Sequence, residues 1–207
     1  MSPRPYRLGQ RLLASEQTRI RILNAARELL MASEGFSTFS IDVIAKRADV
    51  ARMTIYHQFG SKSGLLEALC DSLAMSGGME QLASAFQQAN SLDGLNEYTR
   101  IFSHFWEVDR LVMRRLRALA ALDPDFEQVI RARDERRRKG LQVIVGRLAE
   151  QYGRPAPEAL DEVVNVLYTL LSFECFDILA SPTRSIPEIA SVVQQLAHAA
   201  LRLKEEQ

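Results

Sequence analysis

The sequence predicts an all-α protein in two parts: a small N-terminal helix-turn-helix domain of three helices, then a larger helical domain, with about nine helices in total. Apolar residues recur at three- and four-residue spacing along almost the whole chain, and no segment alternates apolar and polar residues as a half-buried strand does. Basic and acidic residues are also divided unevenly between the two parts. The 207 residues suffice for one or two domains with a sizeable core.

The formal charge of zero combines two unlike regions. Residues 1–62 hold ten Lys/Arg against five Asp/Glu, and residues 63–207 hold 16 against 21. A basic N-terminal third on an acidic body is typical of a protein whose N-terminal part binds a polyanion. A chance fluctuation in composition is the alternative explanation.

The N-terminal residues predict a flexible basic arm, residues 1–14, followed by a helix over about residues 15–34. An apolar stripe indicates the helix, and Gly35 ends it as a C-terminal glycine does. The stripe consists of Ile20, Leu23, Ala26 and Leu30, supported by Ile22 and Leu29. The basic residues of the arm, which lie among prolines, are Arg4, Arg7 and Arg11.

Two short helices joined by a tight turn follow. Ser40 is a good N-cap residue and begins a helix over residues 41–47. Asp49-Val50-Ala51 forms the turn, and the second helix runs over about residues 52–58. Gly60-Ser61 ends this helix and caps the next one.

Helices this short are not stable alone in water, so flanking helices must hold them. The second helix then presents long polar and aromatic groups on one outward face, which suits insertion into the major groove of DNA. An ordinary helical hairpin with solvated polar residues is the alternative. The predicted inward residues are Ile41, Ile44, Ala45, Ala48, Val50, Ile55 and Phe59. The predicted outward residues are Arg52, Met53, Tyr56 and His57.

Residues 18–66 resemble the DNA-binding domain of TetR-type (TetR/AcrR-like) bacterial transcriptional regulators. The resemblance covers about 50 residues in register, which makes it more specific than a helix-turn-helix pattern alone. It rests on Ala25-Ala26, Leu29-Leu30, Gly35-Phe36, Thr38, Ser40-Ile41, Ile44-Ala45, Ala48, Val50, Thr54-Ile55-Tyr56, Phe59, Lys62 and Leu65-Leu66. It implies a DNA-binding domain over residues 15–62 and an effector-binding and dimerisation domain over residues 63–207.

The resemblance implies DNA contacts at the start of each short helix. Thr38 and Ser40 fall where the first short helix of the family meets phosphate. Arg52 and Met53 occupy the base-reading start of the recognition helix, where an arginine suits guanine O6 and N7. Ala51 departs from the usual Ser-type cap, which removes about 1 kcal/mol of N-capping.

Further positions carried over from the family lie along the recognition helix and just after it. Thr54, Tyr56 and His57 fall where the family contacts phosphates or bases. Lys62, at the start of the following helix, falls where the family often grips the backbone. Gln58 stands where a histidine is common, which leaves a neutral phosphate contact.

The C-terminal segments predict a dimer. Residues 158–180 are apolar nearly all round and are expected to form one helix buried on every side, and a last helix over 186–204 has a broad apolar stripe. Two such helices from each of two subunits would form a four-helix bundle, as in the resembled family. A purely intrachain core is the alternative. The predicted partner-facing residues are Leu167, Leu171, Ile178, Val193 and Leu196.

The middle helices are rich in aromatic residues, which suits a cavity for a small lipophilic effector. The same stripe also fits an ordinary core, and His104 fits either a ligand donor or a solvated histidine. The charged run over residues 131–139 is expected to be a solvated helix face. The predicted lining residues are Phe102, His104, Phe105, Trp106, Met113, Leu116, Phe126 and Tyr168.

No motif indicates an enzyme, a metal site or a cofactor. The sequence has neither a Glu-x-x-His pair, nor a G-x-S-x-G elbow, nor a glycine loop that cradles phosphate. Cys70 and Cys175 have no neighbouring His or Cys, so they are expected to be small buried residues in a reducing compartment. With no apolar run of about 18 residues and no signal-like N-terminus, a cytoplasmic protein without a membrane partner is predicted.

The sequence therefore predicts a ligand-responsive, homodimeric regulator. A small lipophilic effector would release it, as a repressor, from a palindromic double-stranded DNA operator. A DNA-binding architectural or cell-cycle factor without a small-molecule ligand is the alternative. A fully packed larger domain with no cavity would favour it.

Overall fold

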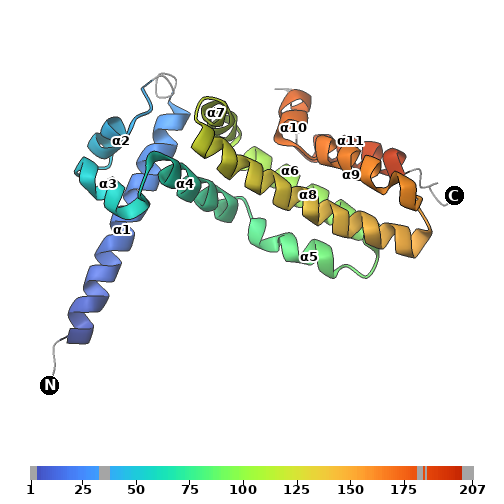
Figure 1. The fold of residues 1–207 in the computed structure, drawn as a ribbon, viewed down its shortest axis with the longest axis horizontal. Coiled ribbons are helices and arrows are strands. Elements are labelled where there is room, and N and C mark those ends of the chain that lie inside the picture. The colour runs from blue at the N-terminus through green and yellow to red at the C-terminus, as the bar shows by residue number, and fades with distance from the viewer. Residues whose placement is uncertain (1–3, 33–37, 181–183, 185, 202–207) are drawn as a thin grey trace. The chain divides into compact units, whose positions relative to one another are not determined.

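A computed structural model describes residues 4–32, 38–180, 184 and 186–201 of the chain. Within these ranges the chain forms eleven α-helices, two short 3-10 helices and no strand, which confirms the all-α class (Figure 1). The 3-10 helices are η1 (Met79–Gln81) and η2 (Pro157–Ala159). None of the helices described is both long and apolar enough to cross a membrane.

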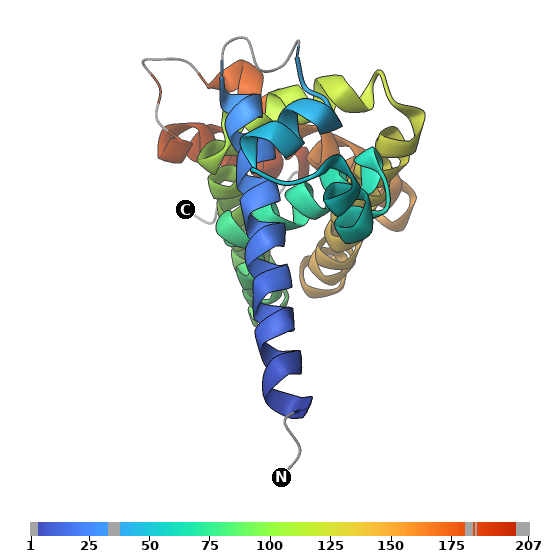
Figure 2. The ribbon, with the colours of Figure 1, turned by 90° about the vertical axis from the view of Figure 1, so that its left-hand side faces the viewer.

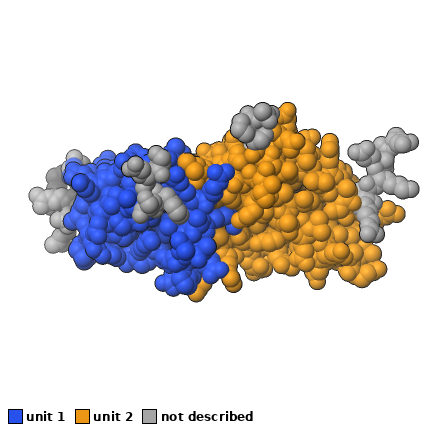
Figure 3. Space-filling view, turned by 90° about the horizontal axis from the view of Figure 1, so that it is seen from above, with its two compact units in different colours: residues 1–72, 114–127 blue, residues 73–113, 128–207 orange. Residues whose placement is uncertain are grey.

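The chain divides into two compact units (Figure 3). The first comprises residues 1–72 and 114–127, and the second comprises residues 73–113 and 128–207. The first unit therefore runs past residue 62, where the sequence placed the domain boundary, and takes in a later stretch of chain. A division of this kind joins segments that are distant in sequence, which helical periodicity alone does not reveal.

Three helices contain a boundary between the units and so contribute to both through the continuous chain. They are α4 (Lys62–Ser76), α7 (Arg110–Ala120) and α8 (Pro124–Tyr152).

The first unit is built around α1 (Arg4–Met31), against which α2 (Ile41–Arg47) packs. Helix α3 (Arg52–Phe59) packs in turn against α2. The fully buried apolar side chains of this unit include Ile22, Leu30, Ile44, Ile55, Leu65 and Leu66. Ile20, predicted on the buried stripe, is instead 48% exposed. Gly35, predicted to end α1, lies outside the described residues.

Residues 4–14 correct the prediction of a flexible arm, because they continue α1 as a regular helix. The prolines do not prevent this, since Pro5 lies in the first turn, where the missing N–H has no helical partner to lose. Figures 1 and 2 both show this end of α1 running clear of α2 and α3.

The second unit is centred on α6 (Ser91–Val108), which packs against α5 (Leu82–Gln87), α10 (Phe173–Leu179) and α11 (Ile186–Leu201). Helix α9 (Leu160–Leu170) packs against α11. The core residues of this unit that are essentially inaccessible include Leu95, Tyr98, Leu141, Val145, Leu148, Leu167, Ile189 and Val193.

The segment 158–180 corrects the prediction of one long helix, because it breaks between α9 and α10. The Leu171 carbonyl accepts hydrogen bonds from Trp106 Nε1 at 3.2 Å and from Arg137 Nη1 at 2.9 Å. Ser172 then caps α10, its hydroxyl accepting from the Cys175 N–H at 3.1 Å. The Leu171 carbonyl thus bonds to side chains from distant segments instead of to the backbone N–H that a continuous helix would offer. Because of this break, the segment forms two helices where one was predicted.

Candidate nucleic-acid interface

Local capping holds the two short helices of the first unit, as the sequence predicts. The Ser40 hydroxyl accepts from the Val43 N–H at 3.4 Å and caps α2. Asp49 in the turn has φ of +52°, a left-handed conformation that aspartate tolerates better than most residues. Gly60, with φ of +76°, ends α3, and the Ser61 hydroxyl accepts from the Gly64 N–H at 3.0 Å at the start of α4.

Helix α3 presents the predicted outward face to solvent. Met53 is 62% exposed, Arg52 and His57 are exposed, and Tyr56 is half-buried. On the opposite face Ile55 is fully buried. A large apolar side chain and a positive charge are therefore displayed together on a helix whose other side is anchored.

Arg52 is positioned by a neighbour on each short helix. Its Nη1 lies 3.2 Å from Asp42 Oδ1 on α2, and its Nη2 donates to the Tyr56 hydroxyl at 3.2 Å. The guanidinium carbon is 5.6 Å from the centroid of the Tyr56 ring. The hydrogen bond to Tyr56, followed by the charge of Asp42, raises the pKa of Arg52. The ion pair is exposed, so a stronger acceptor can displace Asp42.

The far end of α3 is tied to α1. Gln58 Nε2 donates to the Ser15 hydroxyl at 2.8 Å, and the Arg19 guanidinium carbon lies 4.7 Å from the Phe59 ring centroid. The Gln58 amide, predicted to face phosphate, is engaged by α1 in this structure. Ser15 and Gln58 are 43 residues apart, and no motif in the sequence indicates that they meet.

The other predicted DNA-binding residues lie on the same short stretch. Thr38 is exposed just before α2, and Thr54 is half-buried in the first turn of α3. Lys62 is half-buried at the first position of α4. The structure thus places all nine predicted residues on or beside α2, α3 and the start of α4.

Helix α1 is fixed at its C-terminal end by two arginines of the first unit. Arg115 Nη1 donates to the carbonyl oxygens of Leu30 at 2.6 Å and Ala32 at 2.5 Å. Arg47 of α2 lies 3.0 Å from Glu28 of α1. A cation at the carbonyl end of a helix opposes the partial negative charge there. These contacts stabilise the scaffold that carries α3.

The predicted effector-binding residues are divided between the two units. Leu116 and Phe126 are buried in the first unit, whereas the other six belong to the second. His104 is exposed. The rings of Phe102, Phe105 and Trp106 contact one another, with centroids 4.6 to 6.4 Å apart, as core side chains do.

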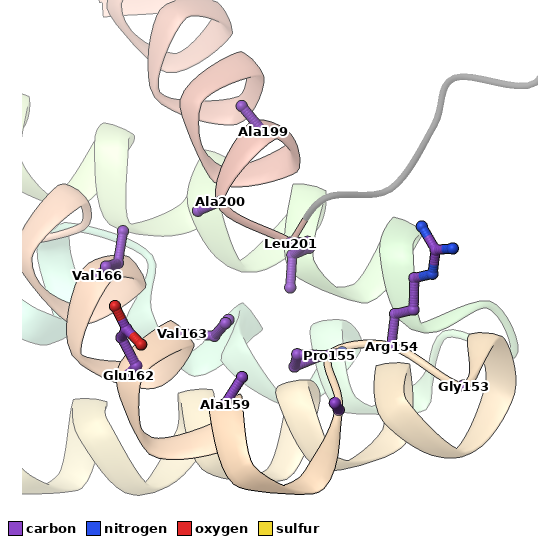
Figure 4. Close-up of a pocket in the computed structure, with 11 residues that line it drawn as sticks. Gly153, Arg154, Pro155, Ala159, Glu162, Val163, Val166, Ala199, Ala200 and Leu201 are labelled. Atoms are coloured by element: carbon purple, nitrogen blue, oxygen red, sulfur yellow. The ribbon is translucent and has the colours of Figure 1, made fainter.

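A pocket of about 740 Å³ lies elsewhere in the second unit, beside η2 and the ends of α9 and α11 (Figure 4). None of the predicted effector-binding residues lines it. Its walls are largely small and apolar, with Arg154 and Glu162 on different sides of it in this view. The remaining lining residues are Gly153, Pro155, Ala156, Ala159, Val163, Val166, Ala199, Ala200 and Leu201.

The predicted partner-facing residues separate into two kinds. Leu167, Leu171 and Val193 are fully buried within their own chain, so they present no surface to a second subunit. Ile178 is 82% exposed and Leu196 is 45% exposed. The three buried residues are enclosed because α6, α9, α10 and α11 pack their apolar faces against one another.

Comparison with known proteins identifies the first unit more specifically. The model of the family described as "Bacterial regulatory proteins, tetR family" matches residues 22–69. The HTH-type transcriptional regulator UidR of Escherichia coli (strain K12) is 42% identical over 55 residues, and UidR of Shigella flexneri matches equally well. These residues make up 27% of this chain and only 28% of the relative.

Solved structures extend the similarity of fold to most of the chain. PfmR of Thermus thermophilus, a TetR family transcriptional regulator, superposes with a TM-score of 0.64 at 22% identity, covering 90% of this chain and 100% of that one. A TetR transcription regulator from Haloarcula marismortui gives 0.68 at 16% identity, covering 90% and 97%. GusR of Salmonella enterica gives 0.62 at 20% identity, covering 90% and 96%.

The match of residues 22–69 and the shared fold agree with the two short helices and the tight turn between them in the first unit. Residues 22–69 match the TetR family of bacterial regulatory proteins, and most of the chain shares the fold of solved TetR-family structures.

Proposed function

We propose that this protein regulates transcription by binding double-stranded operator DNA through α3. The observation that carries the proposal is the outward face of α3, where Arg52, Met53 and Tyr56 stand on a helix whose opposite face is anchored. A rigid helix with exposed polar and aromatic groups suits the major groove. The basic excess of residues 1–62 supports attraction to a polyanion.

Each side chain has a distinct role in the proposed contact. Arg52 exchanges Asp42 for guanine O6 and N7, which accept two parallel hydrogen bonds from a guanidinium. Thr54, Tyr56 and Lys62 contact phosphates and set the position of the helix on the duplex. Base identity is therefore assigned to the start of α3, and general affinity to the residues around it.

The test is enrichment of bound sequences from a library of random duplexes, followed by binding of the enriched duplex. We expect one palindromic sequence, with half-sites centred roughly one helical turn apart or slightly more. Binding should fall steeply with salt. If no sequence is enriched and all duplexes bind equally, the proposed regulatory function is wrong.

A homodimer supports this function, because one helix-turn-helix contacts too few base pairs for useful specificity. The exposed apolar side chains Val166, Ile178 and Leu196, one each on α9, α10 and α11, are the residues we assign to the interface. Ile178→Glu and Leu196→Glu together should give monomers in light scattering, with thermal stability kept. Leu171→Glu is the contrasting variant: the carboxylate would enter the chain's own core, so the protein should unfold instead. A double variant that stays dimeric would place the interface elsewhere.

Release by a small lipophilic effector is the second part of the proposal. The pocket of about 740 Å³ has a volume in the range of ligand sites, and its lining combines small apolar side chains with Arg154 and Glu162. An effector must bind the DNA-incompetent conformation more tightly, because equal affinity for both conformations shifts neither. A screen of lipophilic compounds should yield one that raises the melting temperature and weakens operator binding together.

Ala199→Trp, which places an indole at the pocket wall, should abolish that response and leave DNA binding unchanged. A protein that binds DNA specifically but responds to no compound would favour an architectural or cell-cycle factor.

A further inference from the structure

The N-terminal end of α1 continues well beyond the part of that helix that packs on its neighbours. Residues 12–17 are exposed, with Leu12 and Leu13 about two-thirds exposed, and the helix runs on to Arg4. Figure 2 shows this segment projecting past α2 and α3. We call residues 4–14 the helical arm. Among the side chains of the arm that the structure describes, Gln10 and residues 12–14 are exposed.

All the charged residues of the arm are basic. Arg4, Arg7 and Arg11 lie within it, and the first acidic residue of the chain is Glu16. Positions 4, 7, 11 and 15 are spaced by three, four and four residues, so they share one face of a helix. The positive end of the α1 dipole lies at the tip of the same arm.

Ser15 shows which way that face is turned. It is the next position on the stripe after Arg11, and its hydroxyl accepts the hydrogen bond from Gln58 at the end of α3. The arginine positions therefore lie on the side of α1 that faces the recognition helix. A duplex bound along α3 would therefore lie next to this basic face of α1.

From these observations we infer that the helical arm is a second DNA-contacting element, which binds the phosphate backbone of the duplex that α3 reads. The inference rests on the proposed function. From position 4 to position 15 the helix rises about 16 Å, which equals roughly five base pairs of duplex. Positions 4, 7 and 11 span about 10 Å of that length, which is roughly the rise of three base pairs, so the three arginines can reach several phosphates of the duplex. The arm would add affinity but no base preference.

The first experiment removes the charges. The triple variant Arg4→Gln, Arg7→Gln, Arg11→Gln should lower affinity for the enriched operator by about 10- to 100-fold at ~0.15 M salt. The slope of log K against log salt should fall by about 2.7 for each DNA-bound subunit, because three phosphate contacts are lost. Random duplex should lose as much. The matched control is Arg136→Gln, Lys139→Gln, Arg184→Gln, which removes three exposed positive charges from the second unit. An equal loss in the control, or no loss in the arm variant, overturns the inference.

A second pair of variants tests the helix without altering charge. Gly9→Ala adds a methyl group where no atom lies within 4 Å, and favours the helix, so affinity should rise up to about fivefold. Gln10→Pro interrupts the helix between Arg7 and Arg11, so affinity should fall towards that of the triple variant. Should Gln10→Pro bind as tightly as the parent, the arm does not act as a helix and the inference fails.

The two levels of proposal remain distinguishable. If the unmodified chain binds no duplex, the proposed function is wrong. If it binds and enriches an operator, yet the arm variants match it in affinity and salt slope, only the arm is wrong. The melting temperatures of the arm variants should stay close to that of the parent, because Gln10 and residues 12–14 of the arm are exposed.

Discussion

Arg52 and Arg137 have nearly the same partners in two very different regions. Arg52 of α3 pairs with Asp42 and lies over the Tyr56 ring, and its side chain is 56% exposed. Arg137 of α8 pairs with Asp134 at 3.3 Å and lies 4.5 Å from the Tyr168 ring centroid, but its side chain is only 3% exposed. The main difference between the two arginines is burial.

Burial decides what each arginine can do. In solvent, the Asp42 pair contributes little, so Arg52 is available to another acceptor. In the core, every polar partner of Arg137 matters, because water cannot replace it. Arg137 also donates to the Leu171 carbonyl, while its own backbone carbonyl accepts from the Tyr98 hydroxyl at 2.8 Å. Burial raises the pKa of Tyr98, so this hydroxyl remains a donor.

Replacing Arg137 should produce the largest effect. Arg137→Ala removes an ion-pair partner of Asp134, one of the two donors to the Leu171 carbonyl and a large buried side chain, so the free energy of unfolding should fall by about 3–5 kcal/mol. Urea denaturation followed by circular dichroism measures it. Arg136→Ala, at the exposed neighbouring position, is the control and should change stability by less than about 0.5 kcal/mol. Equal losses of stability at positions 136 and 137 would show that burial of the arginine does not decide its contribution.

Arg52→Ala should show the opposite behaviour. Affinity for the enriched operator should fall by roughly 5- to 150-fold, with a much smaller loss on random duplex, because the lost contact is to a base. The melting temperature should stay the same. Fluorescence anisotropy on both duplexes makes the measurement. Equal losses on the two duplexes would make Arg52 a phosphate contact instead.

Changes at the N-caps of the two short helices should alter the free energy of unfolding by smaller amounts and in opposite directions. Ser40→Ala removes the hydroxyl that caps α2 and should lower the free energy of unfolding by about 1 kcal/mol. Ala51 stands at the N-cap of α3 with no side-chain hydrogen bond, so Ala51→Ser should raise it by a similar amount. Thermal or urea denaturation tests both. If Ala51→Ser has no effect, the start of α3 is already satisfied.

Lys62→Ala should have the smallest effect. As a phosphate contact it should weaken operator and random duplex by the same factor, roughly fivefold, and lower the salt slope by about one. The measurement is a salt titration of both duplexes. Selective loss on the operator would give Lys62 a role in base reading, and unchanged affinity would place it off the DNA.

Prediction from the sequence was accurate where contacts are local. The N-cap at Ser40, the turn at residues 49–51 and the end of α3 at Gly60 each depend on atoms within a few residues, so their signals survive in the linear chain. The buried and exposed faces of α3 followed from helical periodicity for the same reason. The prolines near the N-terminus misled, because their effect depends on whether they fall in the first turn of a helix.

The sequence by itself thus determined the helical class and the outward face of α3. The tertiary structure decided the break at Leu171, whose carbonyl is taken by donors 34 and 65 residues away, and the burial of Arg137 within a run that reads as solvated. It also decided which apolar residues of α9 to α11 remain outside, leaving Ile178 exposed and Leu167 enclosed. A helix apolar on every side does not record which side a neighbour covers, because that choice depends on packing between segments far apart in the chain.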